Sequence, residues 1–317
     1  MTRVRRQPLA FADLPGWPDD DHAAALAVYR LSCRTIPGLE PPPPGDATAL
    51  ARAFFETGFR PVLIEDGNPA LFTGYYEPEL PGRLTPDAHF RYPAFSCPPD
   101  LPAARPWLTR REIAQSGALT GRGLELVWLA DPVDLFFLQV QGSGRIILPD
   151  GRVIRLGFAG KNGHPYRSIG AAMVARGILG PDQVSAAAIR HWINTNPVAG
   201  ADLLMTNPSY VFFRVLDHLS ADQGPLGTLQ CPVTALRSIA VDPAFVPLGL
   251  PVWIDTTGAT PMRRLMIAQD TGSAIKGPQR ADIYFGTGQQ AGEVAGTVRD
   301  TGRMVVLWPN DLALPAT

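Results

Sequence analysis

Residues 265–288 constrain the fold of this chain more than any other stretch, and they read LMIAQDTGSAIKGPQRADIYFGTG. One apolar run ends at Asp270, a turn with glycines carries Lys276, and a second apolar run begins directly after Asp282. Short apolar runs that are bounded by glycine and other turn residues are typical of buried strands. We therefore expect a sheet core here that presents carboxylates at the ends of its strands.

The whole sequence favours a mainly β protein with some helix. Its 317 residues suffice for two domains, or for one large domain with an insertion. The 33 prolines and 31 glycines are dispersed along the chain, which predicts many short strands and turns. A net formal charge of −1 gives no sign of a surface for nucleic acid. The 3 cysteines are too few and too far apart for a disulfide framework.

Periodicity and capping residues predict helices and a larger number of strands. The helices are expected at 21–34, 46–57, 109–114, 168–178 and 181–194, with one or two helical turns at 287–294. The strands are expected at 61–65, 71–76, 124–130, 135–141, 145–148, 152–158, 209–215, 235–241, 251–255, 263–268 and 303–308. Asp66-Gly67-Asn68 and Asp150-Gly151 each predict a hairpin, and Gly142-Ser143-Gly144 is interpreted as a hairpin turn. Asn196-Pro197 is expected to stop a helix.

Several familiar kinds of site are absent from the sequence. Its 5 histidines are scattered, and no pair of histidines or cysteines has the spacing of metal ligands. No Gly-x-Ser-x-Gly elbow indicates a serine hydrolase, and Gly142-Ser143-Gly144-Arg145 lacks the third glycine of a dinucleotide loop. We therefore expect neither a metal nor a cofactor.

Asp270-Thr271-Gly272-Ser273 is similar to the active-site loop of aspartic proteases, and Asp300-Thr301-Gly302 offers a second copy. A bilobal protease needs one such loop in each lobe, and each lobe has about 100 residues or more. The two copies lie only 30 positions apart, and Arg303 stands where the second loop would carry a hydroxyl. We reject the protease interpretation on these grounds.

Three aspartates remain as candidates because each adjoins a strand-like run: Asp242, Asp270 and Asp282. The mouth of a barrel would bring such strand ends together. Any one of them could instead cap a turn through its side chain, and Asp242, directly before Pro243, fits that alternative best. Asp282 fits it worst because Ile283 follows it. An apolar setting raises the pKa of a carboxyl, as a general acid near neutral pH requires.

Five motifs carry a resemblance to a known family. In chain order they are TGYYEP at 73–78, FFLQVQGSG at 136–144, GKNGHPY at 160–166, NPSYVFF at 207–213, and residues 265–288. With these motifs in this order, the chain resembles the membrane-bound lytic murein transglycosylase A family from about Thr73 to near its C-terminus. Asp242, Asp270 and Asp282 resemble the three aspartates for which that family's C-terminal domain is named.

The resemblance implies a double-psi β-barrel domain built from both ends of the chain. It would comprise residues 1–105 and 231–317, with residues 1–59 as a helical lead-in. A second, β-rich substrate domain, residues 106–230, would be inserted between them. The glycan would lie in the groove between the two domains.

The resemblance also implies the activity of a peptidoglycan lytic exotransglycosylase, although the residues themselves leave chain-end and interior cleavage open. Such an enzyme cleaves the β-1,4 bond between N-acetylmuramic acid and N-acetylglucosamine and leaves a 1,6-anhydro end. Asp282 would be the single catalytic acid and base, with Asp270 and Asp242 as neighbours. One carboxylate can suffice because the nucleophile is the sugar's own C6 hydroxyl, which is tethered at high effective concentration.

Two other functions remain open at this point. Glycoside hydrolases ordinarily use two carboxylates, so a hydrolytic muramidase could use Asp282 and Asp270 as a pair. The same barrel also serves proteins that bind wall polymers without cutting them, so a non-catalytic peptidoglycan-binding protein is the third possibility.

Further residues of the motifs are candidate sugar contacts. Gln139, Gln141 and Ser143 suit hydroxyl and acetamido groups, or they face solvent. The tyrosines could stack on sugar rings or lie in the core, and the two basic residues could stabilise charge near the acids or lie in a solvated loop. The full predicted set is Thr73, Gly74, Tyr75, Tyr76, Gln139, Gln141, Gly142, Ser143, Tyr166, Lys276 and Arg280.

Partners and location follow from the same resemblance. It implies peptidoglycan glycan strands as substrate, other cell-wall enzymes as a further class of partner, no nucleic acid, and a monomer. It also implies the periplasm or cell envelope, at the outer membrane, with a role in glycan turnover and cell wall organization. No signal peptide is visible before residues 19–21, and Cys33 lacks the approach of a lipobox.

Overall fold

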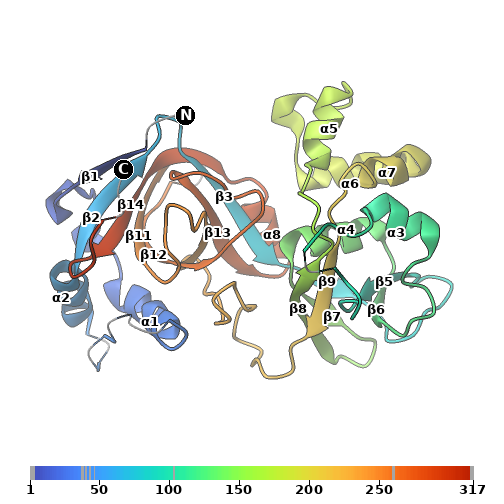
Figure 1. Ribbon diagram of the computed structural model, residues 1–317, viewed down its shortest axis with the longest axis horizontal. Helices are drawn as coiled ribbons and strands as arrows, with labels where there is room; N and C mark the ends of the chain where they lie inside the picture. Colours follow the sequence, from blue (N-terminus) through green and yellow to red (C-terminus); the bar gives the residue numbers. More distant parts are fainter. Residues whose placement is uncertain are drawn as a thin grey trace. The chain divides into compact units, whose positions relative to one another are not determined.

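The computed structural model describes residues 4–36, 39, 41, 42, 44, 45, 47–102, 104–258 and 261–314. They form two compact units, one drawn from 1–76 and 221–317 and the other from 77–220 (Figure 1). The chain therefore crosses between units at 76/77 and 220/221, whereas the sequence suggested boundaries at 105/106 and 230/231. The first crossing lies earlier because the strands between residues 79 and 95 pair within the second unit.

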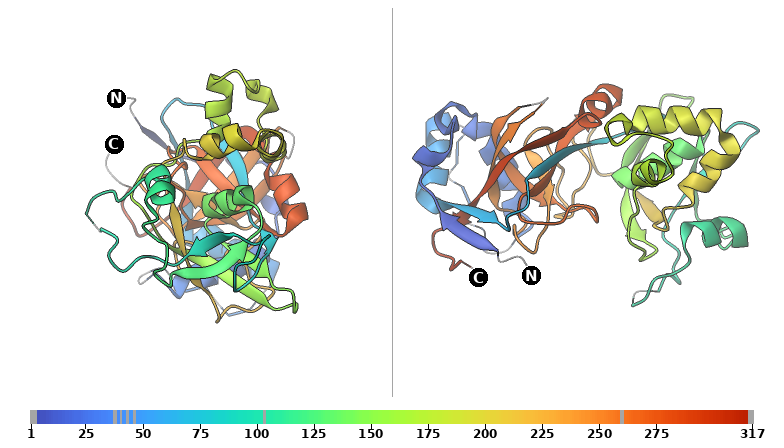
Figure 2. Two further views of the ribbon diagram at one scale, coloured as in Figure 1. Left: turned by 90° about the vertical axis from the view of Figure 1, so that its right-hand side faces the viewer. Right: turned by 90° about the horizontal axis from the view of Figure 1, so that it is seen from above.

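The first unit contains a closed β-barrel, and Figures 1 and 2 show its strands curving round to enclose an interior. Six strands pair in the order β14-β11-β12-β10-β13-β3, and β3 pairs back onto β14. Their bounds are β3 Leu71–Glu77, β10 Ser238–Val241, β11 Pro251–Thr257, β12 Arg263–Asp270, β13 Arg280–Thr287 and β14 Arg299–Pro309. The barrel is built from both ends of the chain, as the family resemblance implied.

Strand β14 pairs in turn with two strands from the start of the chain. Its last part pairs with β2 (Phe59–Glu65), where Val305 lies opposite Leu63. Its first part pairs with β3, where Arg299 lies opposite Thr73. The hairpin predicted at Asp66-Gly67-Asn68 is therefore wrong, because β2 and β3 follow one another along β14 and do not pair with each other. The unpredicted strand β1 (Arg5–Pro8) extends the sheet beyond β2.

The two faces of the barrel wall bury different apolar clusters, because successive side chains of a strand point to opposite faces. The interior cluster includes Ile64, Phe72, Val252, Met266, Ile283 and Val306. The outer cluster packs Leu63, Trp253, Ile267 and Val305 against helices α1 (His22–Cys33) and α2 (Thr48–Gly58). Both helices were predicted, and both are confirmed. A further helix, α8 (Gln289–Ala295), follows β13.

The inserted unit combines strands with more helix than the sequence indicated. One sheet has the order β4-β7-β8-β9, and β5 pairs with β6. The strands are β4 Glu79–Pro81, β5 Tyr92–Phe95, β6 Glu125–Leu129, β7 Gly144–Ile147, β8 Val153–Lys161 and β9 Val211–Val215. The helices are α3 Arg110–Ser116, α4 Pro132–Gln141, α5 Ile169–Ala175, α6 Ala186–Thr195 and α7 Pro197–Leu204. The hairpin predicted at Asp150-Gly151 is confirmed, since it joins antiparallel β7 and β8.

The strand predicted at 135–141 is wrong, because these residues belong to helix α4. Asp131 caps that helix by accepting from the Val133 amide, Pro132 is its first residue, and Gly142 ends it with a φ of 79°. Periodicity does not distinguish strand from helix in these seven mostly apolar residues, but the caps on either side do. Gly142-Ser143-Gly144 is thus a helix end followed by a strand, and not a hairpin turn.

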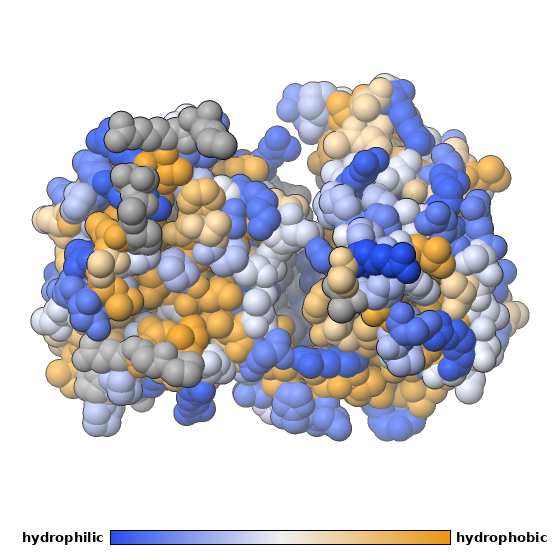
Figure 3. All heavy atoms as spheres, in the orientation of Figure 1, coloured by the Kyte–Doolittle hydropathy of each residue, from blue (hydrophilic) through white to orange (hydrophobic). Residues whose placement is uncertain are grey.

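The helix predicted at 181–194 is shorter than expected. Residues 181–183 form a separate turn of 3-10 helix, and α6 begins at Ala186 after its cap Ser185. Asn196-Pro197 ends α6 as predicted, because Asn196 is its C-cap and Pro197 begins the next helix, α7. Among the described residues, no helix is long and apolar enough to cross a membrane. On the face shown in Figure 3, apolar side chains lie among hydrophilic ones on both units.

Candidate active site

Strands β3 and β13 place five side chains, four of them predicted site residues, on one face of the barrel wall. Phe72, Ala281 and Ile283 belong to the interior cluster. The alternate residues therefore point the other way: Thr73 and Tyr75 on β3, and Arg280, Asp282 and Tyr284 on β13. Because β3 and β13 are neighbours in the sheet, these side chains form one cluster. The rings of Tyr75 and Tyr284 lie 5.2 Å apart.

Asp270 reaches the same cluster through the short strand β10. Ala240 of β10 pairs with Asp282 of β13 on one side and with Asp270, the last residue of β12, on the other. The two carboxylates thus lie at the same level of the wall, with only an alanine between them in the sheet. The sequence pattern predicted that these strand ends would meet.

The carboxyl of Asp282 is half-buried and is held through one oxygen. The hydroxyl of Thr73 donates to Oδ1 of Asp282 at 2.5 Å. Nη2 of Arg280 donates to Oγ1 of Thr73 at 2.8 Å, which directs the hydroxyl proton towards the carboxylate. Among the residues that the structure describes, none donates a hydrogen bond to Oδ2 of Asp282. One oxygen is therefore fixed, and the other is left for a ligand or water.

Burial raises the pKa of Asp282, and the nearby charge of Asp270 raises it further. The hydrogen bond from Thr73 and the positive charge of Arg280 act in the opposite direction but do not cancel the effect of burial. Asp282 is therefore more readily protonated near neutral pH than an exposed aspartate, as a general acid must be.

Asp270, in contrast, is surrounded by donors. Its Oδ1 accepts from the Thr228 amide at 2.9 Å, the Thr228 hydroxyl at 3.0 Å and the Thr271 amide at 2.8 Å. Its Oδ2 accepts from the Tyr75 hydroxyl at 3.2 Å. Burial raises the pKa of Asp270, and these hydrogen bonds oppose the rise because they favour the charged form.

Tyr75 stays protonated between the two carboxylates. Burial raises the pKa of Tyr75 well above its usual value, and the charges of Asp270 and Asp282 add to that effect. Its hydroxyl can therefore act only as a donor or as a neutral acceptor at physiological pH. Oδ2 of Asp270 therefore has a hydrogen-bond donor that brings no positive charge into the site.

Asp242 and Lys276, two further predicted residues, pair with each other. Oδ1 of Asp242 lies 3.5 Å from Nζ of Lys276 and accepts from the Ala244 amide at 3.3 Å. Oδ2 accepts from the Gly277 amide at 3.0 Å. Within the described chain, Asp242 makes no hydrogen bond or ion pair with Asp270 or Asp282. Asp242 thus stabilises the turn that carries Lys276, as expected if its role is to cap a turn.

Gly74 and Tyr76, also predicted as sugar contacts, pack against the elements around β13. A Cβ atom on Gly74 would come within 2.8 Å of Phe285 and of the backbone of Ala295, so only glycine fits there. Tyr76 lies against Gly292 of α8, where a Cβ atom would meet its ring at 2.6 Å. Tyr76 thus has the packing role that the sequence left open for the tyrosines, whereas the packing role of Gly74 was not anticipated.

The predicted residues of the inserted unit lie on or after α4 and before α5. Gln139 is buried, its Nε2 donates to the Val211 carbonyl at 3.2 Å, and its Oε1 has no hydrogen-bond partner in the described part of the chain. Gln141 and Gly142 end the helix, and Ser143 is buried. Tyr166 is half-buried, with its pKa raised by burial. The hairpin proposed for the glutamines is wrong, since both lie on α4.

Sequence inspection missed three residues of the cluster: Thr228, Thr271 and Tyr284. Tyr284 follows Asp282 by two positions on a strand, so the period of two could have placed it on the same face. Thr271 adjoins Asp270 directly. Thr228 lies in an irregular loop 42 positions before Asp270, and no sequence signal points to it. Among the described residues, no group of three or more His, Cys, Asp or Glu side chains could hold a metal ion.

Comparisons with known proteins cover both units. Residues 71–214 match the MltA specific insert domain family, and residues 237–308 match the 3D domain family. The membrane-bound lytic murein transglycosylase A of Vibrio cholerae is 36% identical over 270 residues, which is 82% of this chain and 71% of that protein. A solved membrane-bound lytic murein transglycosylase from Agrobacterium tumefaciens has a TM-score of 0.84 at 34% identity, over 96% of this chain and 97% of that chain. The structure of E. coli MltA with bound chitohexaose has a TM-score of 0.72 at 28% identity, over 96% and 94%.

Proposed function

We propose, from the premise that this chain belongs to the membrane-bound lytic murein transglycosylase A family, that Asp282 alone serves as its catalytic acid and base. The family's members are enzymes that degrade peptidoglycan, and their membrane-bound character implies a place in the cell envelope. The proposed reaction cleaves the β-1,4 bond between N-acetylmuramic acid and N-acetylglucosamine and leaves a 1,6-anhydro end.

The observation that carries this proposal is the unequal use of the two oxygens of Asp282. Thr73 fixes Oδ1, and no described residue donates to Oδ2. A carboxyl that is protonated on Oδ2 can donate its proton to the glycosidic oxygen as the C1–O4 bond breaks. The resulting carboxylate then accepts the proton of the C6 hydroxyl while O6 bonds to C1. The proton lost in the first step is regained in the second, so no water is consumed.

Asp270 supports this acid without reacting itself. Both of its oxygens already accept hydrogen bonds from Thr228, Thr271 and Tyr75. A nucleophile or a base that activates water would have to give up these contacts. Its negative charge instead raises the pKa of Asp282 and keeps that carboxyl protonated for the first step. Asp270 is therefore a positioning residue, as are Thr73 and Arg280.

The two-carboxylate muramidase is less well supported for the same reason. An inverting or retaining hydrolase needs a second carboxylate that is free to attack or to activate water. Asp270 accepts four hydrogen bonds from neighbouring residues, which leaves it poorly placed for either task. Only Asp282 has an oxygen without a donor in the cluster.

Digestion of purified peptidoglycan with mass analysis of the products tests the proposal. A lytic transglycosylase gives muramic acid ends that are lighter by one water than those of a hydrolase, and they cannot be reduced with borohydride. Reducible ends would show that the muramidase interpretation is correct. Binding without any soluble product from the active, folded chain would support the non-catalytic binding protein.

A further inference from the structure

A cavity of about 680 Å³ lies inside the inserted unit, lined only by residues between Tyr92 and Tyr210. The cavity is within the range of roughly 300–1,000 Å³ that is usual for small-molecule sites. Its walls come from β5, α3, the first turn of α4, the end of α6 and α7. None of these residues belongs to the acid cluster of the barrel. The cavity therefore needs an explanation of its own.

Arg110 is the one basic residue among those that line the cavity, and it is held rigidly. It is the first residue of α3, and only 6% of its surface is exposed. Its Nη2 donates to the Ser209 carbonyl at 2.8 Å. Its guanidinium carbon lies 4.8 Å from the ring centre of Phe136 and 5.1 Å from that of Tyr210. Two aromatic faces and a carbonyl thus fix where the charge lies.

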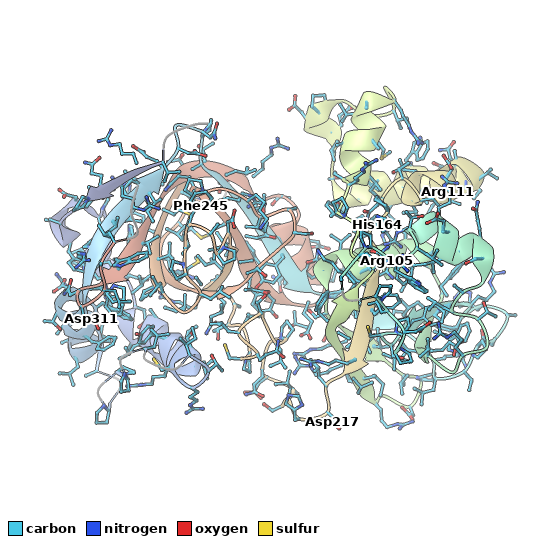
Figure 4. All side chains as sticks on the ribbon, in the orientation of Figure 1. Arg105, Arg111, His164, Asp217, Phe245 and Asp311 are labelled. Carbon is cyan, nitrogen blue, oxygen red and sulfur yellow. The ribbon has the colours of Figure 1, made fainter. Side chains whose placement is uncertain are left out.

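Arg110 has no carboxylate partner among the residues that the structure describes. Asp131 also lines the cavity, but it caps α4 through the Val133 amide at 2.7 Å and pairs with Arg190 at 3.1 Å. A buried arginine without an acidic partner is uncommon in proteins. The neighbouring Arg111, labelled in Figure 4, is exposed and pairs with Asp202 at 2.6 Å.

The guanidinium of Arg110 remains charged even though it is buried. Burial lowers the pKa of Arg110 to about 10, which still leaves it protonated at neutral pH. Its Nε is buried without a partner, and only one of its five N–H groups has a hydrogen-bond acceptor in the described chain. The positive charge is therefore unbalanced on the protein side, and donors remain for an anion.

The rest of the cavity is mainly apolar. Side chains that line it include Ile113, Leu119, Val133, Leu135, Leu204 and Met205. Several other lining residues, among them Ala114, Asn194 and Ala201, are exposed, so the cavity opens to solvent. An apolar chamber with one fixed cation suits a ligand that has an anionic head and an apolar body.

We propose that this cavity binds a small carboxylate with an apolar body, whose carboxylate accepts hydrogen bonds from the guanidinium of Arg110. Arginine is suited to this role because its planar fork matches the two oxygens of a carboxylate. The low polarity of the walls strengthens the attraction and excludes strongly hydrated anions. The chemistry is shared by free alkanoic acids and by the carboxyl terminus of a short apolar peptide.

Calorimetric titration of the whole chain with matched acids and amides tests the proposal. Hexanoate and N-acetyl-leucine are the acids, and hexanamide and N-acetyl-leucinamide are the uncharged controls. We expect at least one acid to bind at least tenfold more tightly than its amide. Tighter binding of N-acetyl-leucine than of hexanoate points to a peptide carboxyl terminus, and the reverse order points to a free alkanoic acid.

Two variants locate the binding. Arg110→Met should weaken the acid at least tenfold, and Arg111→Met, the neighbouring arginine outside the cavity, should leave its affinity within twofold. If Arg110→Met does not fold, Ala201→Trp replaces it, because this exposed position narrows the cavity and leaves Arg110 in place. The proposal is overturned if amides bind as tightly as acids, if none of the four probes binds at millimolar concentration, or if the cavity variant binds normally.

Discussion

In the barrel, two carboxylates lie one strand apart, and most of the groups that hold them are neutral hydroxyls and amides. In the inserted unit, a guanidinium lies between aromatic rings and pairs with no carboxylate of the described residues. Both units thus bury a charge without pairing it directly to its opposite. The inserted unit also contains the ordinary arrangement, because buried Glu77 meets Arg145 at 2.8 Å and Arg155 at 3.1 Å.

The difference between paired and unpaired charges indicates which groups are available to ligands. Glu77 forms ion pairs with two arginines, and it contributes to stability by linking residue 77 to β7 and β8. A charge that is held by neutral donors or by rings keeps a strong attraction for an incoming proton or ion. Asp282 and Arg110 are of this second kind. The following experiments test that distinction, from the largest expected effect to the smallest.

Asp282→Asn should have the largest effect, because the amide keeps the shape of the side chain but cannot donate an acidic proton. We expect the initial rate of product release from peptidoglycan to fall by about 10²–10⁴-fold, the usual contribution of a general acid. Circular dichroism should show an unchanged fold. The control is Asp255→Asn on β11, whose partner is Arg263. A rate within tenfold of the unmodified protein would show that Asp282 is not the acid.

Glu77→Gln should have the largest effect on stability. Glu77 is 1% exposed, and the change removes the buried carboxylate that lies 2.8 Å from Arg145 and 3.1 Å from Arg155. Breaking a buried ion pair from one side typically costs about 3–5 kcal/mol of unfolding free energy. Urea denaturation measures the loss. Glu79→Gln, on the more exposed neighbour 4.0 Å from Arg145, should cost roughly 0–1 kcal/mol.

Arg110→Met sharpens the comparison with Glu77→Gln. Removing Arg110 leaves no uncompensated charge behind, since no described carboxylate depends on it. Its loss should therefore destabilise the protein less than the loss of Glu77, when both are measured by urea denaturation under the same conditions. An equal or larger loss would mean that Arg110 is primarily a structural residue.

Thr73→Val should move the pH dependence of activity. The rate requires protonated Asp282, so activity falls as the pH rises through the raised pKa of that residue. The hydroxyl of Thr73 favours the charged form, and its removal raises the pKa of Asp282 further. The alkaline limb of the pH–rate profile should therefore move upward by about one unit, given the usual strength of a hydrogen bond to a charged group. Thr73→Ser keeps the hydroxyl and should keep the limb in place; a downward shift in Thr73→Val contradicts the assignment.

Replacing His22 should have the smallest effect, and it should change only the pH dependence of the unfolding free energy. Its side chain is fully buried, neither ring nitrogen has a hydrogen-bond partner among the described residues, and burial lowers the pKa of His22 below 6.5. The unfolded chain therefore binds a proton near pH 6.5 that the folded chain does not, and stability is lost as the pH falls below that value. Each pH unit should cost at most about 1.4 kcal/mol. His22→Phe should flatten this slope in urea denaturation at pH 7.5 and pH 5.5, and an unchanged slope would assign the dependence to other groups.

The sequence allowed the acids to be predicted better than the strand pairing around them. Asp270 and Asp282 end or begin apolar runs, and that local pattern sufficed to bring them together. Which strands pair in a closed barrel depends on contacts between residues far apart in the chain, so the local turn at 66–68 gave a wrong partner for β2. The donors around Asp270 include Thr228, whose loop has no periodicity to interpret.

In the inserted unit, the sequence predicted neither the helix α4 nor the cavity. Helix α4 was predicted as a strand because composition outweighed the caps at Asp131 and Gly142. The cavity around Arg110 draws on several separate segments, and no motif links them. A site whose parts are joined only by packing leaves no spacing in the sequence, whereas a site on adjacent strands leaves a period of two.

The pairing of β14 has a consequence for the order of events during synthesis. Ribosomes release the chain from its N-terminus, and the strands and sheets of residues 77–220 find all their partners within that stretch. Strand β3 cannot pair until β13 and β14 have been synthesised. The hydrogen bond between Thr73 and Asp282 likewise joins residues 209 positions apart. Asp282 acquires its unusual proton affinity only when the last strand closes the wall. In a nascent chain, Asp282 therefore has the proton affinity of an exposed aspartate. The proposed catalytic acid forms only after the whole chain has been made and folded.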